Sequence, residues 1–328
     1  MLSLYPEIEP FSSYYLSNNC TGKKLATEHQ IYVEQCGNPS GIPVVFLHGG
    51  PGSGCRPSHR CFFDPKRYHI ILFDQRGCGR SRPLGTLANN TTDDLIQDME
   101  LIRQHIGIKN WLVFGGSWGS TLGLYYASHY AEHVSGLILR GLFLGRQQDI
   151  DWVYSNSGAA KIFPEAWHNL IKDLPCSQQT NPLTIIYKQL VGDDIQLSNA
   201  MFDKLQRWES SLVYWQKSLS FEEKTDKQAI KFEEKSASII QLYYSLNQCF
   251  IADSPLLEII ENIRHIPTKI IHGRQDMVCP VEQAWQLKQH WPEADLSIID
   301  MAGHVASEAK LINALLEATN DFATLNTE

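Results

Sequence analysis

The residues best suited to do chemistry lie between Leu112 and Leu122, where an apolar run passes through a glycine-rich turn into a segment of small residues. At its centre is Gly-Gly-Ser-Trp-Gly, in which Ser117 has a glycine two residues away on either side. A G-x-S-x-G pattern between a strand and a helix is typical of a nucleophilic serine held on a tight turn. Such a turn does not tolerate side chains two residues from the serine. We therefore predict a nucleophile at Ser117, although similar turns also occur in α/β proteins that have none.

Two further groups that a nucleophilic serine needs follow later apolar runs. Asp276 comes shortly after the run 268–272, and His304 comes shortly after the run 296–300. Because the carboxyl ends of parallel strands meet at one edge of a sheet, we expect these side chains to lie close together. The chain order Ser, Asp, His is that of α/β-hydrolases. Asp74 also follows an apolar run, but it precedes the serine and opens a loop that we interpret as a structural brace.

The three side chains have complementary proton chemistry. A serine hydroxyl is a weak nucleophile until a base takes its proton, so we expect His304 to act as general base on Ser117 and later to protonate the leaving group. Asp276 is expected to hold the correct tautomer of the imidazole and to stabilise its cation. The oxyanion of the tetrahedral intermediate needs backbone donors, and we predict the N–H groups of Trp118 and Gly50.

The elements that position these groups follow an α/β pattern. Short continuous apolar runs predict strands buried on both faces. They lie at 43–47, 69–74, 135–140, 268–272 and 296–300, with helical spacing at 92–106 and 308–323. Their alternation predicts an α/β fold with a mainly parallel sheet flanked by helices. The looser alternation around 29–34 predicts an antiparallel hairpin at the edge of the sheet.

A change of character divides the chain. After about residue 145 strand alternation is lost, and tryptophans, tyrosines and charged residues recur at helical spacing until about residue 263. This pattern predicts a mostly helical cap inserted between core strands. We expect residues 1–145 to form the first part of the core, 146–263 the cap, and 264–328 the second part of the core.

Composition limits the classes of function. The chain has 328 residues, 43% hydrophobic and 20% charged, which suits one large core with an inserted subdomain. A formal net charge of −8 argues against nucleic acid as a partner. We see no apolar run of membrane-spanning length and no signal-peptide pattern, and we expect a cytoplasmic protein that does not bind membranes. The eight cysteines lack zinc-site or disulfide-scaffold spacing, so we expect them to be reduced, with no metal and no cofactor. The oligomeric state stays open.

Several motifs together resemble one family, the prolyl aminopeptidases or proline iminopeptidases, which are α/β-hydrolases. The matching segments are HGGPG at 48–52, DQRGCGRS at 74–81, NTT at 90–92, GGSWGS at 115–120 and GH at 303–304. The likeness extends over nearly the whole chain. It implies a metal-independent cytoplasmic serine exopeptidase that releases an N-terminal proline from short peptides with a free N-terminus.

The resemblance also implies residues that bind the substrate. A cap over the site excludes longer N-terminal extensions, and a carboxylate inside it pairs with the α-ammonium group. Glu209 matches the first of two glutamates that serve this role in the family. Gln241 stands where the family usually has the second, and Ser245 where it usually has an aromatic residue, so the chain departs from the pattern at both positions. Phe143 resembles the aromatic wall of the proline pocket. On the residues alone, Glu209 would also suit a solvated helix face and Phe143 an ordinary core.

Other interpretations of the sequence make different predictions. An esterase or amidase of the same fold, without need of a free amine, would hydrolyse N-acylated or simple ester substrates as fast as prolyl arylamides. A non-catalytic binding protein would be expected to lack one of the three candidate residues, and none is lacking. Serine at position 117 excludes the dehalogenases and epoxide hydrolases, which need an aspartate there. Cys279, three residues after Asp276, is expected close to the site, so a bulky thiol reagent should inhibit the enzyme.

Overall fold

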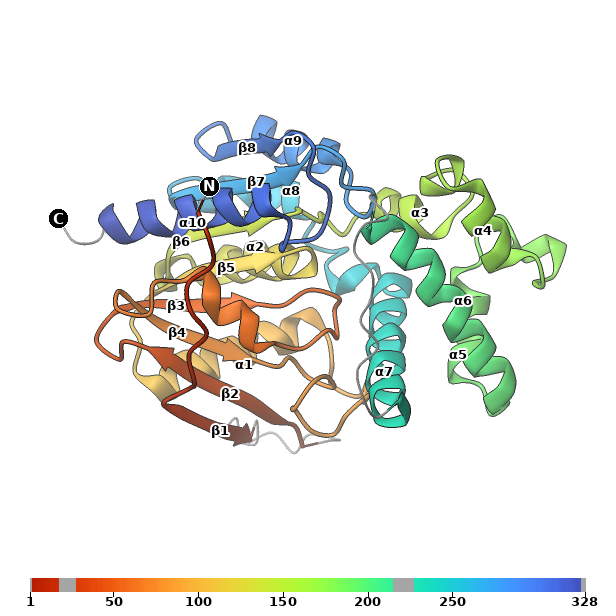
Figure 1. Ribbon diagram of the computed structural model, residues 1–328, viewed down its shortest axis with the longest axis horizontal. Coiled ribbons are helices and arrows are strands. Elements are labelled where there is room, and N and C mark those ends of the chain that lie inside the picture. The colour runs from red at the N-terminus through yellow and green to blue at the C-terminus, as the bar shows by residue number, and fades with distance from the viewer. Residues whose placement is uncertain (1, 18–27, 215–226, 326–328) are drawn as a thin grey trace.

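One eight-stranded sheet organises the molecule (Figure 1). The computed structural model describes residues 2–17, 28–214 and 227–325. The strand order is β1-β2-β4-β3-β5-β6-β7-β8, and only β2 runs antiparallel to its neighbours. The strands are β1 (Ser12–Ser17), β2 (Gln30–Gly37), β3 (Ile42–Leu47), β4 (Tyr68–Phe73), β5 (Trp111–Gly116), β6 (Val134–Arg140), β7 (Thr268–Gly273) and β8 (Asp295–Ile299). The predicted mainly parallel sheet is therefore confirmed.

Helices cover both faces of the sheet and bury its central strands. Every residue of β4 and β5 is buried, which explains why these strands are continuous apolar runs in the sequence. One face packs against α1 (Thr92–Ile106), α2 (Trp118–His129) and α9 (Val281–His290). The other face packs against α10 (Ala309–Leu325). The α/β class predicted from the sequence is the observed one.

Helix α1 shows how local sequence sets an element boundary. The Thr91 side chain accepts a hydrogen bond from the Asp94 N–H, and the Asp94 carboxylate accepts one from the Thr91 N–H. This capping box satisfies N–H groups that have no partner within the helix. Gly107 ends the helix in the left-handed region, at a φ of 79° that favours glycine. The helix therefore covers the range 92–106 predicted from its periodicity.

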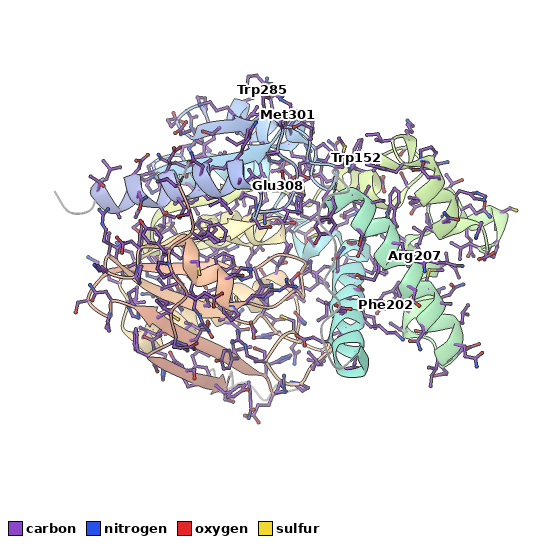
Figure 2. The ribbon with its side chains drawn as sticks, viewed as in Figure 1. Trp152, Phe202, Arg207, Trp285, Met301 and Glu308 are labelled. Atoms are coloured by element: carbon purple, nitrogen blue, oxygen red, sulfur yellow. The ribbon has the colours of Figure 1, made fainter. Side chains whose placement is uncertain are left out.

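A group of helices is inserted in the sequence between β6 and β7 and lies to one side of the sheet (Figure 1). Its members are α3 (Gln147–Tyr154), α4 (Pro164–Ile171), α5 (Leu183–Val191), α6 (Ile195–Val213), α7 (Lys227–Leu246) and α8 (Leu256–Ile259). Trp167 and Trp208 meet edge to face, with ring centroids 5.0 Å apart, in a separate hydrophobic cluster of these helices. On α6, Phe202 is buried in this cluster while Arg207 is exposed (Figure 2).

Helix α7 connects the inserted helices to the sheet. Its Leu242 belongs to the cluster of the inserted helices, whereas Ile240 and Tyr244 pack into the core beside the sheet. The Tyr244 hydroxyl also donates a hydrogen bond of 2.9 Å to Asn90 Oδ1. The insertion is thus anchored by buried contacts on two faces of one helix. No helix in the described parts of the chain has both the length and the apolar character needed to cross a bilayer.

Candidate active site

Ser117 lies on the turn between β5 and α2 in a strained backbone conformation, with φ 55° and ψ −126°. A Cβ on Gly115 would lie 2.2 Å from the Gly119 carbonyl oxygen, and a Cβ on Gly119 would lie 2.1 Å from the Leu47 carbonyl oxygen. Only glycine fits at either position, which is the physical reason for the G-x-S-x-G spacing. Positive φ costs a non-glycine residue about 1–3 kcal/mol. The rest of the fold therefore holds Ser117 in place.

Asp276 and His304 follow β7 and β8, as expected from the sequence, and are joined by a hydrogen bond. His304 Nδ1 donates to Asp276 Oδ2 at 2.7 Å, and the N–H groups of Val278 and Cys279 donate to Asp276 Oδ1 at 3.0 and 2.8 Å. Burial alone would raise the pKa of Asp276, but the neighbouring imidazole and these hydrogen bonds outweigh it and lower that pKa. The carboxylate is therefore ionised at neutral pH and keeps the proton of His304 on Nδ1.

Asp74 takes part in a different network. Its Oδ2 accepts hydrogen bonds from Arg80 N–H at 2.8 Å and Arg80 Nε at 2.7 Å, and its Oδ1 accepts one from the Cys55 N–H at 2.6 Å. Arg80 also contacts the buried carboxylate of Glu34 at 2.9 Å. Asp74 thus braces the loop after β4, while the carboxylate that contacts His304 is Asp276.

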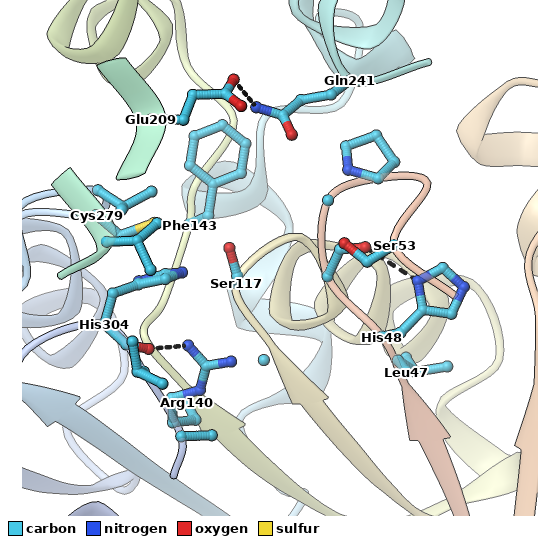
Figure 3. Close-up of a pocket in the computed structure, with 18 of the residues that line it drawn as sticks. Leu47, His48, Ser53, Ser117, Arg140, Phe143, Glu209, Gln241, Cys279 and His304 are labelled. Carbon is cyan, nitrogen blue, oxygen red and sulfur yellow. Dashed lines mark hydrogen bonds between the residues drawn. The ribbon is translucent and has the colours of Figure 1, made fainter. Parts of the chain in front are cut away.

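Ser117 and His304 both line a cavity of about 490 Å³ (Figure 3). Within the described residues, no hydrogen bond joins the Ser117 hydroxyl to His304. Ser117 instead contacts the thiol of Cys279, which is only 2% exposed. Burial raises the pKa of this thiol well above its usual value, and the contact with Ser117 offsets only a small part of that rise. Cys279 is therefore a neutral neighbour of the serine at physiological pH.

The two predicted oxyanion donors lie beside the serine. Trp118 is the first residue of α2, so its N–H has no acceptor within the helix. Gly50 lines the same cavity, and a Cβ on its neighbour Gly49 would lie 3.4 Å from the Ser117 Cβ. The glycine loop after β3 thus approaches the nucleophile closely enough for a backbone N–H to reach a bound carbonyl.

Gln75 forms hydrogen bonds both to His48, at the start of the glycine loop, and to Trp118, at the start of α2. Gln75 accepts a hydrogen bond of 2.9 Å from the Trp118 indole on its Oε1. Its backbone N–H and its side-chain amide donate to Nε2 and the carbonyl oxygen of His48, each at 3.0 Å. Because Nε2 accepts, the proton of His48 lies on Nδ1, which donates to Gly49 O at 2.9 Å. Burial lowers the pKa of His48, in agreement with a neutral ring.

At the far side of the cavity, the inserted helices bring a carboxylate and an amide together (Figure 3). Gln241 Nε2 donates to Glu209 Oε1 at 2.9 Å, and the Tyr154 hydroxyl donates to the same oxygen at 2.9 Å. Burial raises the pKa of Glu209 to about 7, although these two hydrogen bonds act to lower it. Glu209 therefore lines the cavity rather than a solvated helix face, the alternative that the sequence left open.

The loop after β6 brings Phe143 to the cavity wall. Its carbonyl oxygen accepts a hydrogen bond of 2.6 Å from the Thr121 hydroxyl, and its N–H donates to the Ser120 hydroxyl at 3.2 Å. Ser245 lines the cavity as well, with its hydroxyl bonded to Gln241 O, one turn earlier on α7, at 2.9 Å. This wall therefore has an aromatic ring at position 143 and a small side chain at position 245.

Sequence analysis did not single out two other residues of the cavity. Tyr154 on α3 carries no spacing signal, and its contact with Glu209 follows only from the packing of α3 against α6. Arg140 ends β6, and its position at the end of an apolar run was a signal comparable to those that identified Asp276 and His304. In residues 2–17, 28–214 and 227–325, no three His, Cys, Asp or Glu side chains gather as a metal site.

Comparisons with known proteins identify the fold and the family of the chain. A family model described as "alpha/beta hydrolase fold" matches residues 42–311. The chain is 44% identical over 324 residues to the proline iminopeptidase of Arabidopsis thaliana, a match that covers 98% of this chain and 83% of the relative. It is 41% identical over 324 residues to the proline iminopeptidase of Xylella fastidiosa strain Temecula1, covering 98% and 100%.

Solved structures support the fold. The crystal structure of a Mycobacterium smegmatis proline iminopeptidase aligns with a TM-score of 0.59 over 96% of this chain and 100% of that one, at 15% sequence identity. At so low an identity the likeness concerns the fold alone. The sequence relatives are much closer, and they match nearly from end to end. By these matches, the chain belongs to the proline iminopeptidase family of α/β-hydrolases.

Proposed function

We propose that the protein is a serine exopeptidase that releases an N-terminal proline, and other small residues, from short peptides with a free N-terminus. One observation carries this proposal: Ser117 and His304, whose ring is hydrogen-bonded to Asp276, border the same cavity as the carboxylate of Glu209. The family relatives, named proline iminopeptidases, support it.

In the proposed acylation step, Ser117 Oγ attacks the carbonyl carbon of the N-terminal residue while His304 Nε2 takes the hydroxyl proton. The oxyanion is stabilised by the N–H groups of Trp118 and Gly50, each donor being worth roughly 3–4 kcal/mol in the transition state. The bond to the leaving nitrogen then breaks, and His304 gives its proton to that nitrogen. Asp276 stabilises the imidazolium throughout.

Deacylation reverses these roles. A water molecule replaces the departed peptide, His304 takes one of its protons, and the resulting hydroxide attacks the acyl group on Ser117. The carbon–oxygen bond to the serine breaks, and the proton returns from His304 to Ser117 Oγ. Free proline and the unmodified enzyme are the products, so no metal or other cofactor is required by the proposed reaction.

The free amine of the substrate binds at the other side of the cavity. Glu209 supplies a carboxylate for the ammonium group, and Gln241 supplies a neutral acceptor through its Oε1. Phe143 packs against the pyrrolidine ring. An N-terminal extension would have to displace the ammonium from its place beside Glu209, which is why we propose an exopeptidase.

The decisive experiment compares a prolyl arylamide with its N-acetyl form. We expect acetylation to lower kcat/KM by about 100-fold or more. The acetyl group removes the charge-assisted contact with Glu209 and adds bulk at the place of the ammonium group. Equal rates would instead favour the second candidate, an esterase or amidase of the same fold without need of a free amine. The variant Ser117→Ala, purified in parallel, measures any contaminating hydrolase.

We also propose that the enzyme acts in the cytoplasm. The seven cysteines in the described parts of the chain are all free thiols, as is usual in a reducing compartment. Fractionation of cells that express the tagged protein tests this location. A periplasmic or secreted pool would contradict it.

A further inference from the structure

The cavity has charges of opposite sign at its two ends. Glu209 lies at one end, and Arg140 lies on the other side of Ser117 (Figure 3). Arg56 also lines the cavity. A substrate that spans the cavity therefore meets a carboxylate before the nucleophile and a guanidinium after it. The function proposed above uses only the first of these two charges.

Arg140 has no acidic partner in the described residues. Its Nη1 donates to the His304 carbonyl oxygen at 2.8 Å, and no carboxylate lies within 4.0 Å of the guanidinium among those residues. Asp276 and Glu308 act on it only from longer range. Leaving a charge in a poorly solvated site without a partner is costly, and a bound anion would offset that cost.

The neighbouring histidine shows the positive character of this end. Burial is the main reason why the pKa of His59 falls to about 3, and the positive charges of Arg56 and Arg140 lower it further. His59 stacks on Phe46, with ring centroids 4.3 Å apart, and both line the cavity. A negatively charged group of a ligand is therefore favoured here, next to aromatic walls.

The guanidinium lies next to the turn that carries Ser117. A Cβ on Gly116 would lie 2.5 Å from Arg140 Nη2 and 3.0 Å from its Nε, so the guanidinium packs on the residue directly before Ser117. In a dipeptide the free carboxylate belongs to the residue just after the scissile bond, and successive Cα atoms are about 3.8 Å apart. The planar guanidinium matches a carboxylate with two parallel hydrogen bonds.

We infer that Arg140 binds the C-terminal carboxylate of a dipeptide and makes the enzyme selective for prolyl dipeptides with a free acid. The inference rests on the function proposed above and adds to it the second recognition point of the substrate. Glu209 holds the ammonium group, Ser117 attacks the only peptide bond, and Arg140 holds the carboxylate of the leaving residue. Arg140 is thus a specificity-determining residue.

The first test uses the unaltered enzyme on Pro-Ala and its C-terminal amide Pro-Ala-NH₂, with a prolyl arylamide as reference. We expect kcat/KM to be about 10- to 100-fold higher for the free acid, the usual effect of one charge-assisted contact. Equal values for the acid and the amide would overturn the inference and leave the proposed function intact. If none of the three compounds is hydrolysed, the proposed function itself is contradicted.

The second test replaces the guanidinium. In Arg140→Met the preference for Pro-Ala over Pro-Ala-NH₂ should fall to about one, and kcat/KM for the prolyl arylamide, which has no carboxylate, measures any loss that is common to all three substrates. A matched control is Arg207→Met, which removes the same charge from the exposed side of α6 and should keep the full preference. A preference that persists in Arg140→Met would overturn the inference.

Arg140 also bonds to the carbonyl of His304, so a positioning role has to be distinguished. If Arg140→Met slows the arylamide, the acid and the amide by the same factor, the residue only positions His304 and the inference is wrong. Should that variant not fold, Arg140→Lys takes its place, because lysine keeps the charge without the planar fork. The preference of Arg140→Lys for Pro-Ala over Pro-Ala-NH₂ should then lie between one and the value of the unaltered enzyme. An unchanged preference would count against carboxylate binding by the planar guanidinium.

Discussion

The side-chain amide of Gln241 donates a hydrogen bond of 2.9 Å to Glu209 Oε1, the same oxygen that accepts the Tyr154 hydroxyl. The family resemblance implies a second glutamate at the position that Gln241 occupies in this chain. Here a single carboxylate faces the substrate amine, supported by two neutral donors. The charge at this end of the cavity is therefore at most −1, and it depends on the protonation of one residue.

Replacing Glu209 by glutamine should weaken binding of the substrate amine. We expect kcat/KM for a prolyl arylamide to fall by about 100-fold in Glu209→Gln, because the charged partner of the ammonium is lost. Hydrolysis of a simple acetate ester, which has no amine, should be unchanged and serves as the control for an intact Ser117. Parallel losses on both substrates would mean that Glu209 supports the fold rather than the amine.

The protonation of Glu209 should also produce a pH dependence that is specific to the amine. Its pKa, raised by burial to about 7, means that the carboxylate is charged above that pH and becomes neutral as the pH falls below it. The ratio of kcat/KM for the prolyl arylamide to that for the acetate ester should therefore drop on the acid side, by up to tenfold per pH unit. Taking the ratio removes every pH effect that the two substrates share. In Glu209→Gln this ratio should not vary on the acid side.

Restoring a second carboxylate at position 241 should change both affinity and pH dependence. In Gln241→Glu two carboxylates lie in contact, and their repulsion raises the pKa of the pair. We expect KM for the prolyl arylamide to fall severalfold at about pH 8, with little gain at pH 6. At about pH 8 the carboxylates are more fully ionised, while much of the substrate amine, with a pKa near 8, is still protonated. The comparison variant Gln241→Leu loses only the hydrogen bond that lowers the pKa of Glu209. The fall of kcat/KM on the acid side should therefore begin at higher pH in this variant, without a gain in affinity. Initial rates over a pH series distinguish the two.

Substitution of Asp276 should impair turnover without impairing the fold. In Asp276→Asn, the shape is retained but the amide no longer fixes the proton of His304 on Nδ1, and we expect kcat to fall by about 10⁴-fold. Thermal unfolding monitored by circular dichroism checks that the protein remains folded. A variant of full activity would point to another acid, with Asp74 as the next residue to exchange.

Modification of Cys279 should inhibit the enzyme, but slowly. The thiol contacts Ser117, so a bulky adduct would occupy the space of the substrate carbonyl. Because burial raises its pKa well above the usual value, little reactive thiolate is present at neutral pH, and the exposed Cys176 should react first. Mass spectrometry of the variant Cys176→Ser follows the adduct on Cys279 against activity. Full activity of protein fully modified at Cys279 would refute this prediction.

The sequence predicted the core of the fold because its strands are buried on both faces. Strand β7 was predicted at 268–272 and extends from Thr268 to Gly273, and α1 was predicted with the bounds that it has. Ser117, Asp276 and His304 could be located because each follows an apolar run at the same edge of the sheet. Helix α9 was not predicted, since its exposed Trp285 interrupts the apolar pattern.

Contacts between distant segments could not be predicted in the same way. Tyr154 and Gln241 are 87 residues apart, and the hydrogen bond of 2.7 Å between them depends on how α3 and α7 pack. Among the described residues no carboxylate pairs with Arg140, and the sequence does not show this either, because it depends on where distant carboxylates lie in the fold. Local spacing identifies residues that share one sheet edge, whereas the substrate-binding wall is assembled from helices whose mutual packing has no periodic signal.

The nucleophile and the amine acceptor stand on separate structural supports, Ser117 at the end of strand β5 and Glu209 on helix α6 of the insertion. Under the proposed function, the distance between the sheet and the insertion determines how many residues are removed. A hydrolase with the same chemistry, but with α6 set one residue-length farther out, would cut after the second residue and release dipeptides. Exchange of the insertion alone is therefore a route by which this fold could acquire a new cleavage register.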